Sequence, residues 1–114
     1  MSIKRHESSK ILSTAVEANG FAFLAGLTPK DVSQDIRGQT KQVLAEIDRV
    51  LALCGTDKTK IVSATIWVSD IRYRDGMNEE WIPWIGQHLP VRACIEAKLA
   101  DPRMLVEIQV TAVK

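Results

Sequence analysis

The sequence predicts an α+β fold, in which a mixed β-sheet carries two helices packed on one face. Two observations lead to this class. Segments with alternating or β-branched apolar residues, typical of strands, lie near both ends and in the middle of the chain, and two segments between them have apolar residues at helical spacing. The resulting order is strand, strand, helix, strand, helix, strand, strand, which favours one sheet with both helices on the same side.

The chain opens with a predicted β-hairpin. Asn19-Gly20 is a strong signal for a tight turn, and it separates an extended stretch at Ser13–Glu17 from a strand at Ala22–Ala25. A further strand near Ile3–Arg5 would lengthen this part of the sheet. We therefore expect two or three neighbouring strands before the first helix.

A long amphipathic helix is predicted from about Ser33 to Cys54, because apolar residues recur there on one helical face. Asp31 or Ser33 can cap its start by accepting hydrogen bonds from free backbone N–H groups, and Gly55 can end it in a left-handed conformation. Local signals therefore predict both boundaries of this helix.

Three strands and a second helix follow. Lys60–Val68 is rich in β-branched residues and predicts a buried central strand, and the segment from about Asp75 to Gln87 has helical spacing. Pro83 lacks an N–H group, so we expect it to kink that helix or end it early. Val91–Ala97 and Met104–Val113 are the last two strands, which we expect to pair as a hairpin that turns at residues 100–103.

Composition and charge narrow the class of protein. At 114 residues the chain is expected to form one domain, residues 1–114. A net charge of +1, with basic residues spread along the chain, disfavours a nucleic-acid partner, and the longest apolar stretch, Phe21–Leu27, is too short to span a membrane. Cys54 and Cys94 have no neighbour at a metal-ligand or redox spacing, and two histidines alone do not predict a metal site. We expect free thiols, no metal, no membrane and a cytoplasmic location.

The candidate site lies in the last two strands. Alternate residues of a strand share a face, so Arg92 and Cys94 point one way, and Val91 and Ile95 point the other way, toward the expected core. In the expected hairpin, Cys94 lies across from Glu107. The pattern therefore predicts that Arg92, Cys94 and Glu107 share one polar face.

Each of these three residues can be interpreted as functional or as purely structural. The planar guanidinium of Arg92 suits a carboxylate ligand, yet Arg92 could equally pair with Glu96 or Glu107 on a solvated sheet face. Glu107 lies between apolar residues, so it could act as a base toward water, although an acid on a sheet face is usually paired with a basic neighbour. Cys94 has no histidine close in sequence and is better explained as a pocket wall than as a nucleophile.

The same residues resemble the RidA/YjgF family of reactive-intermediate deaminases, in particular its shorter, YoaB-like members. The resemblance rests on Arg92-Ala93-Cys94 after a proline and on Glu107 in Val-Glu-Ile, and it extends over nearly the whole chain. Further matching segments are Ala25-Gly26, Cys54-Gly55, residues 62–68 and Met77-Asn78-Glu79.

The resemblance implies a chorismate-mutase-like α+β domain that forms a homotrimer, with ligand clefts between adjacent subunits. It also implies an activity without a cofactor, the hydrolysis of 2-imino or enamino acids to 2-keto acids and ammonia. By position, Arg92 would bind the substrate carboxylate, Glu107 would orient or activate water, and Cys94 would lie beside that water. Asn78 and the backbone near Ala25 and Gly26 would line the pocket.

Two positions depart from the family pattern. Leu12 stands where the best-studied deaminases of the family have a tyrosine, and Ala25 stands where they have a serine. We therefore expect a more apolar pocket, to which Leu12 contributes. The loss of the tyrosine keeps an alternative open, namely a non-catalytic protein that binds or senses a small carboxylate in the same cleft. A ribonuclease, a label sometimes given to this family, is disfavoured by the near-neutral charge.

Overall fold

The computed structural model describes residues 2–114, which form one six-stranded mixed sheet with two α-helices. From edge to edge, the strands are ordered β1-β2-β3-β6-β4-β5. The strands are Ile3–Ser8 (β1), Ser13–Ala18 (β2), Phe21–Leu24 (β3), Ile61–Val68 (β4), Val91–Glu96 (β5) and Val106–Val113 (β6). The helices are Ile36–Leu53 (α1) and Arg74–Ile85 (α2), and two short 3-10 turns are Lys58–Lys60 (η1) and Ile71–Tyr73 (η2). The predicted α+β class is confirmed.

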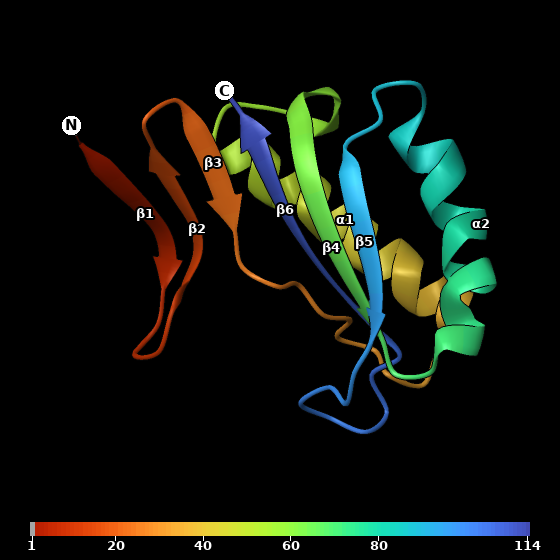
Figure 1. Cartoon of the computed structure of the whole chain (residues 1–114). Coiled ribbons are helices and arrows are strands. Elements are labelled where there is room, and N and C mark those ends of the chain that lie inside the picture. Colours follow the sequence, from red (N-terminus) through yellow and green to blue (C-terminus); the bar gives the residue numbers. More distant parts are fainter. Residues whose placement is uncertain (1) are drawn as a thin grey trace.

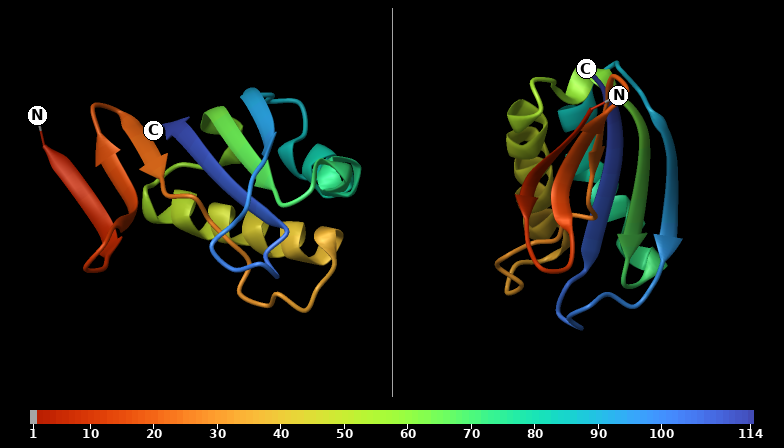
Figure 2. Two further views of the ribbon diagram at one scale, coloured as in Figure 1. Left: turned by 60° about the horizontal axis from the view of Figure 1, so that its bottom comes forward. Right: turned by 90° about the vertical axis from the view of Figure 1, so that its left-hand side faces the viewer.

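The sheet has one covered and one bare face (Figures 1 and 2). Helix α1 packs against β3 and β6, and α2 packs against α1 near the β5 edge. The core between them consists of apolar side chains from both layers, and its largest fully buried members are Ile47, Leu51, Ile66, Met77 and Ile108. Within residues 2–114, neither helix is both long and apolar enough to cross a membrane.

The N-terminal part follows the sequence expectation. Strands β1, β2 and β3 form an antiparallel ladder. Asn19 and Gly20 connect β2 to β3 with φ angles of 53° and 81°, the left-handed values that a two-residue hairpin turn requires. The turn therefore fixes the register of β2 against β3.

The start of α1 differs from the expectation. Asp35, rather than Asp31 or Ser33, caps the helix, because its carboxylate accepts the N–H of Gly38 at 2.8 Å. Asp31 instead accepts the N–H of Ser33 and so closes a turn before the helix. The end of the helix agrees with the expectation, since Gly55 follows it with a φ of 74°.

Pro83 ends α2 early, as expected. It lies in the last turn, the helix ends at Ile85, and Gly86 follows with a φ of 66°. The helix therefore stops before Gln87, and the chain turns back toward the sheet to form β5.

The predicted hairpin between the last two strands is wrong. Strand β4 lies between them: it pairs parallel with β5 and antiparallel with β6. The parallel pairing requires a crossover, which α2 supplies, and residues 97–105 then pass the end of β4 to reach its other side. This order leaves β5 at the edge of the sheet. The more apolar β4 then forms hydrogen bonds with a neighbouring strand on each side.

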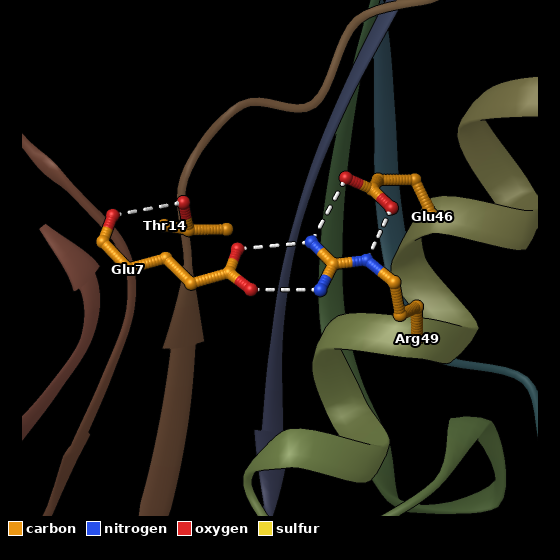
Figure 3. A network of polar contacts seen from close by, with 4 residues as sticks. All are labelled: Glu7, Thr14, Glu46 and Arg49. Carbon is orange, nitrogen blue, oxygen red and sulfur yellow. Dashed lines mark hydrogen bonds and ion pairs between the residues drawn. The ribbon is translucent and has the colours of Figure 1, made fainter. Parts of the chain in front are cut away.

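An ionic network ties the first strand to α1 (Figure 3). The guanidinium of Arg49 donates to both carboxylate oxygens of Glu7, at 2.8 and 2.9 Å, and to the carboxylate of Glu46 on its own helix, at 2.7 and 3.1 Å. Glu7 has a φ of 50°, and its carbonyl accepts the hydroxyl of Thr14 at 3.3 Å. These contacts hold the outermost strand against the covered face.

The interior position of β4, with a paired strand on each side, makes Ile66 a sensitive probe of the fold. Ile66 is fully buried, and its neighbours across the ladders are Cys94 and Ile108. Ile66→Ala should lower the free energy of unfolding by about 2–5 kcal/mol, because the cavity it leaves cannot collapse between two paired strands. Denaturant unfolding measures this, with Ile11→Ala, at a side chain that is 89% exposed, as the control. A loss as small as that of the control would contradict the central packing of β4.

Candidate active site

Glu107 and Gly26 form one half of the candidate site, on the bare face of the sheet. Glu107 lies in β6 opposite Trp67 of β4. The segment after β3 runs beside it, because the backbones of Leu27 and Ile108 exchange hydrogen bonds of 2.8 and 3.1 Å. A Cβ atom on Gly26 would lie only 2.2 Å from Oε2 of Glu107, so the carboxylate occupies the space that any side chain would need. The backbone at Gly26 therefore forms a wall of the Glu107 environment.

The carboxyl group of Glu107 is half-buried and has no cationic partner within residues 2–114. Burial raises its pKa above the ordinary value for glutamate. The structure of the single chain therefore does not support the alternative that a basic neighbour neutralises Glu107. A carboxylate in this state accepts protons more readily than an exposed one.

Arg92 and Asn78 form the other half, at the β5 edge. Nη1 of Arg92 donates to Oδ1 of Asn78 in α2 at 2.7 Å, and the guanidinium carbon lies 5.4 Å from the ring centre of Trp81. These contacts hold the guanidinium without neutralising it. Within residues 2–114, Arg92 forms no ion pair, and Glu96 instead accepts the backbone N–H of Ile71 at 2.9 Å. The charge of Arg92 therefore remains available for an anionic ligand.

A groove of about 390 Å³ lies beside the Arg92 guanidinium. Its polar members are Arg92 and Asn78, and its apolar walls come from α2 and the segment after it, including Trp81, Ile82 and Leu89. Trp81 is a contact that the sequence pattern did not assign to the site, although it lies one helical turn from Asn78. The groove therefore offers a positive charge next to apolar surface.

Cys94 points to the same side as Arg92 and packs against the core. Burial raises the pKa of its thiol, even though the positive charges of Arg92 and Arg74 lower it. A thiol in that state is mostly protonated near neutral pH, which disfavours a nucleophile. Cys94 is not among the residues that line the groove in the single chain, so its place in the wall of the pocket stays a prediction.

The prediction that Arg92, Cys94 and Glu107 share one face is wrong for the single chain. Arg92 and Cys94 pair in register with Ala64 and Ile66 of the covered face, whereas Glu107 pairs with Trp67 of the bare face. The insertion of β4 between the two strands removes the predicted opposition of Cys94 and Glu107. It also reverses the expected burial in β5, where Val91 and Ile95 are 71% and 45% exposed.

The remaining predicted site residues lie on the β2–β3 side of the sheet. Ala25 directly follows β3, and its N–H donates to Thr14 at 2.9 Å. Leu12, which is 54% exposed, immediately precedes β2 at the same end of that strand pair. Both lie several strands away from Arg92 in the order of the sheet. The candidate residues thus form two groups: the guanidinium group (Arg92, Asn78, Cys94) and the carboxylate group (Glu107, Gly26, Ala25). Leu12 lies apart from both, at the start of β2.

Comparison with known proteins gives matches over almost the entire chain. The profile of the family described as Endoribonuclease L-PSP matches residues 2–114. A RutC family protein of Haemophilus ducreyi is 41% identical over 111 residues, covering 96% of this chain and 95% of that protein, and RutC family protein YoaB of Escherichia coli is 34% identical over 113 residues, covering 98% of each. The crystal structure of a YjgF family protein from Neisseria meningitidis is 43% identical, has a TM-score of 0.97, and covers 100% of this chain and 96% of that chain.

The name of a more distant relative states an enzymatic activity. Reactive Intermediate Deaminase A, chloroplastic, of Arabidopsis thaliana is 28% identical over 106 residues. The match covers 88% of this chain and 57% of the longer plant protein.

The raised pKa of Glu107 has a consequence for stability. The folded state holds the Glu107 proton more tightly than the unfolded state, so ionisation of Glu107 opposes folding as the pH rises. Glu107→Gln should therefore gain stability relative to wild type as the pH rises from about 4 to about 7. Denaturant midpoints measured at one protein concentration test this.

Glu46→Gln is the matched control of opposite sign. The hydrogen bond from Arg49 lowers the pKa of Glu46, so its charge stabilises the fold and is lost as the pH falls. This variant should lose stability relative to wild type over the same rise in pH. A Glu107→Gln variant that behaves like Glu46→Gln would contradict the desolvation of Glu107.

Proposed function

This chain belongs to the RidA/YjgF family, and we propose that it hydrolyses 2-imino or enamino acids to 2-keto acids and ammonia in a cleft built by two subunits. The observation that carries the proposal is the pair of uncompensated charges in this small chain. Arg92 is positioned by Asn78 and lacks a carboxylate partner within residues 2–114, and Glu107 is partly desolvated and lacks a cationic partner there. Such a pair suits a substrate that has a carboxylate group for Arg92 to bind and an imine carbon to which water can add beside Glu107.

The division of the candidate residues supports a site between subunits. In one chain the guanidinium group and the carboxylate group lie on opposite faces of the sheet, with β4 between them. The bare face that holds Glu107 also exposes the apolar side chains of Phe23, Val91 and Ile95. A second copy of the chain that covers this face would bury these side chains and could bring its own Arg92 to Glu107. We propose the homotrimer as that assembly and the cytoplasm as its location.

The reaction follows from these two charges. The guanidinium of Arg92 forms two parallel hydrogen bonds with the substrate carboxylate and so fixes the adjacent imine carbon. Glu107 accepts a proton from water while the water oxygen bonds to that carbon, and the C=N double bond becomes a C–N single bond. The protonated Glu107 gives that proton to the nitrogen, which completes the neutral carbinolamine. Glu107 then accepts the hydroxyl proton of the carbinolamine and passes it to the nitrogen, as the C=O bond forms and the carbon–nitrogen bond breaks. The products are a 2-keto acid and ammonia, and no electrons are exchanged with an outside partner.

The environment of Glu107 suits both proton transfers. A carboxyl group whose pKa is raised by burial binds the proton of water more firmly in the first step than an exposed carboxyl group does, and it remains acidic enough to release that proton in the second. The backbone of Gly26 limits where the carboxylate can lie. By the family resemblance, the best-studied deaminases carry a tyrosine and a serine where this chain has Leu12 and Ala25, so the cleft would be more apolar and Glu107 more strongly desolvated.

The activity can be measured with imino acids that an amino-acid oxidase generates in the assay. Semicarbazide traps the imine, and a deaminase diverts it to the keto acid. Arg92→Ala should reduce kcat/KM roughly 100-fold through the loss of two charge-assisted hydrogen bonds, and Glu107→Gln should reduce kcat by at least as much. Arg103→Ala is the matched control, because Arg103 is an exposed arginine that pairs with Asp101 in a loop. It should keep full activity.

Two outcomes would contradict this proposal. Wild-type protein that diverts no imine from several amino acids is not a deaminase, and binding of a 2-keto acid by that same protein would support the non-catalytic carboxylate binder instead. Full activity in both Arg92→Ala and Glu107→Gln would show that the reaction occurs elsewhere.

Mixed assemblies test whether the cleft joins two subunits. Arg92→Ala and Glu107→Gln chains are co-refolded in equal amounts and assayed together. If each site takes its arginine from one subunit and its glutamate from the next, about one quarter of the sites regain both groups. Activity should therefore rise to about one quarter of the wild-type value, far above either variant alone. A mixture that stays at the level of the single variants would place both groups in one chain.

A further inference from the structure

Three side chains with metal-binding atoms meet at the sheet edge opposite Arg92, where β1 and β2 pass the end of α1. His6 comes from β1, Glu17 from β2, and Cys54 is the residue that ends α1. One nitrogen, one oxygen and one sulfur atom of these residues all lie within 4.8 Å of one another. The spacing along the sequence does not predict this cluster, because three separate elements supply it.

The cluster is shielded from solvent. The side chains of His6 and Glu17 are only 12% and 11% exposed, and Cys54 is 2% exposed. Nε2 of His6 lies 2.5 Å from Oε2 of Glu17. A shielded set of polar atoms that converge from three elements is arranged more like a binding site than like a solvated surface pair.

The neighbouring contacts hold the three ligands in place. Arg49 fixes Glu7, the residue next to His6, against α1 (Figure 3). Gly55 turns the chain directly after Cys54. Lys114 forms an ion pair with Oε1 of Glu17, which leaves Oε2 directed toward His6. Contacts within the protein therefore position β1, β2 and the end of α1 around the cluster without a bound ion.

The charges around the cluster also limit what it can bind. Lys114 and Lys4, which lies opposite Glu17 in the β1–β2 ladder, are positive and oppose a cation. A Cys54 thiolate and the Glu17 carboxylate together supply two negative charges, which offset a divalent ion. A groove of about 330 Å³, lined by Lys4, Glu17 and Lys114, opens to solvent beside Glu17. Only an ion that binds nitrogen and sulfur ligands strongly would overcome the electrostatic repulsion from the two lysines.

We propose that His6, Glu17 and Cys54 bind a divalent transition-metal ion of the zinc type. One nitrogen, one oxygen and one sulfur ligand match the donor preference of Zn²⁺, with water in the fourth position. Metal–ligand bonds of about 2.0–2.3 Å require His6 and Glu17 to move apart to admit the ion, and Cys54 to release its proton to solvent. Lys114 keeps Glu17 oriented from outside the coordination sphere. The ion would connect β1, β2 and α1, independently of the proposed catalytic cleft.

Co²⁺ and Zn²⁺ test this site in the full-length protein, freed of any affinity tag. Bound Co²⁺ should give the sulfur-to-cobalt charge-transfer absorption of a thiolate complex, and Zn²⁺ should remove it and raise the melting temperature. Cys54→Ala should abolish the absorption, and His6→Asn, at a less buried position, should weaken Co²⁺ binding by about 100-fold or more. Cys94→Ala, which removes the other free thiol, is the matched control and should bind Co²⁺ as wild type does.

Two results would overturn the proposal. Absence of the charge-transfer band, together with an unchanged melting temperature at millimolar Zn²⁺, would leave His6 and Glu17 as an ion pair beside a core cysteine. A band that survives Cys54→Ala but disappears in Cys94→Ala would place the thiolate ligand elsewhere. Neither result depends on deaminase activity.

Discussion

The structure depends most on β4 being hydrogen-bonded along both of its edges. This strand pairs with β5 on one side and with β6 on the other, and its inward-facing residues Ala64, Ile66 and Val68 are all buried. A strand this apolar would be costly at the edge of a sheet, where one row of backbone groups has no partner. Its position between β5 and β6 requires the chain to cross over through α2 and to return past the strand end. The same position separates Arg92 from Glu107.

That separation determines how a cleft can be built. A single chain offers an uncompensated guanidinium at one sheet edge and an uncompensated carboxylate on the opposite face. Neither is satisfied by a neighbour within residues 2–114, and both are held by specific contacts, Asn78 for Arg92 and Gly26 for Glu107. When copies of one small domain assemble symmetrically, each interface joins the half-site of one copy to the complementary half-site of the next. Each interface then completes one site. The exposed apolar residues of the bare face are consistent with such an assembly.

The features that the sequence predicts correctly are local ones. Asn19-Gly20 and Gly55 adopt left-handed backbone, and Pro83 lies in the last turn of α2, which ends two residues later. Each of these signals acts through the chemistry of its own residue. The cap of α1 could not be chosen in the same way, because Asp31, Ser33 and Asp35 all have capping side chains. The strand order depended on tertiary packing. Nothing in residues 97–105 distinguishes a hairpin from a crossing, so the faces assigned to Arg92 and Glu107 followed an incorrect pairing. The family resemblance supplied the candidate residues, and the structure separates them into two groups.

The position of β6 has a consequence for how the protein is made. The last strand of the chain lies in the interior of the sheet and joins the ladder of β1, β2 and β3 to that of β4 and β5. Until β6 has formed, β3 and β4 each have one edge without a partner strand. Pairs such as Phe21 with Val113 close over almost the full length of the chain, which slows folding. Unpaired strand edges favour aggregation, so the incompletely folded chain is at risk until β6 has paired on both sides.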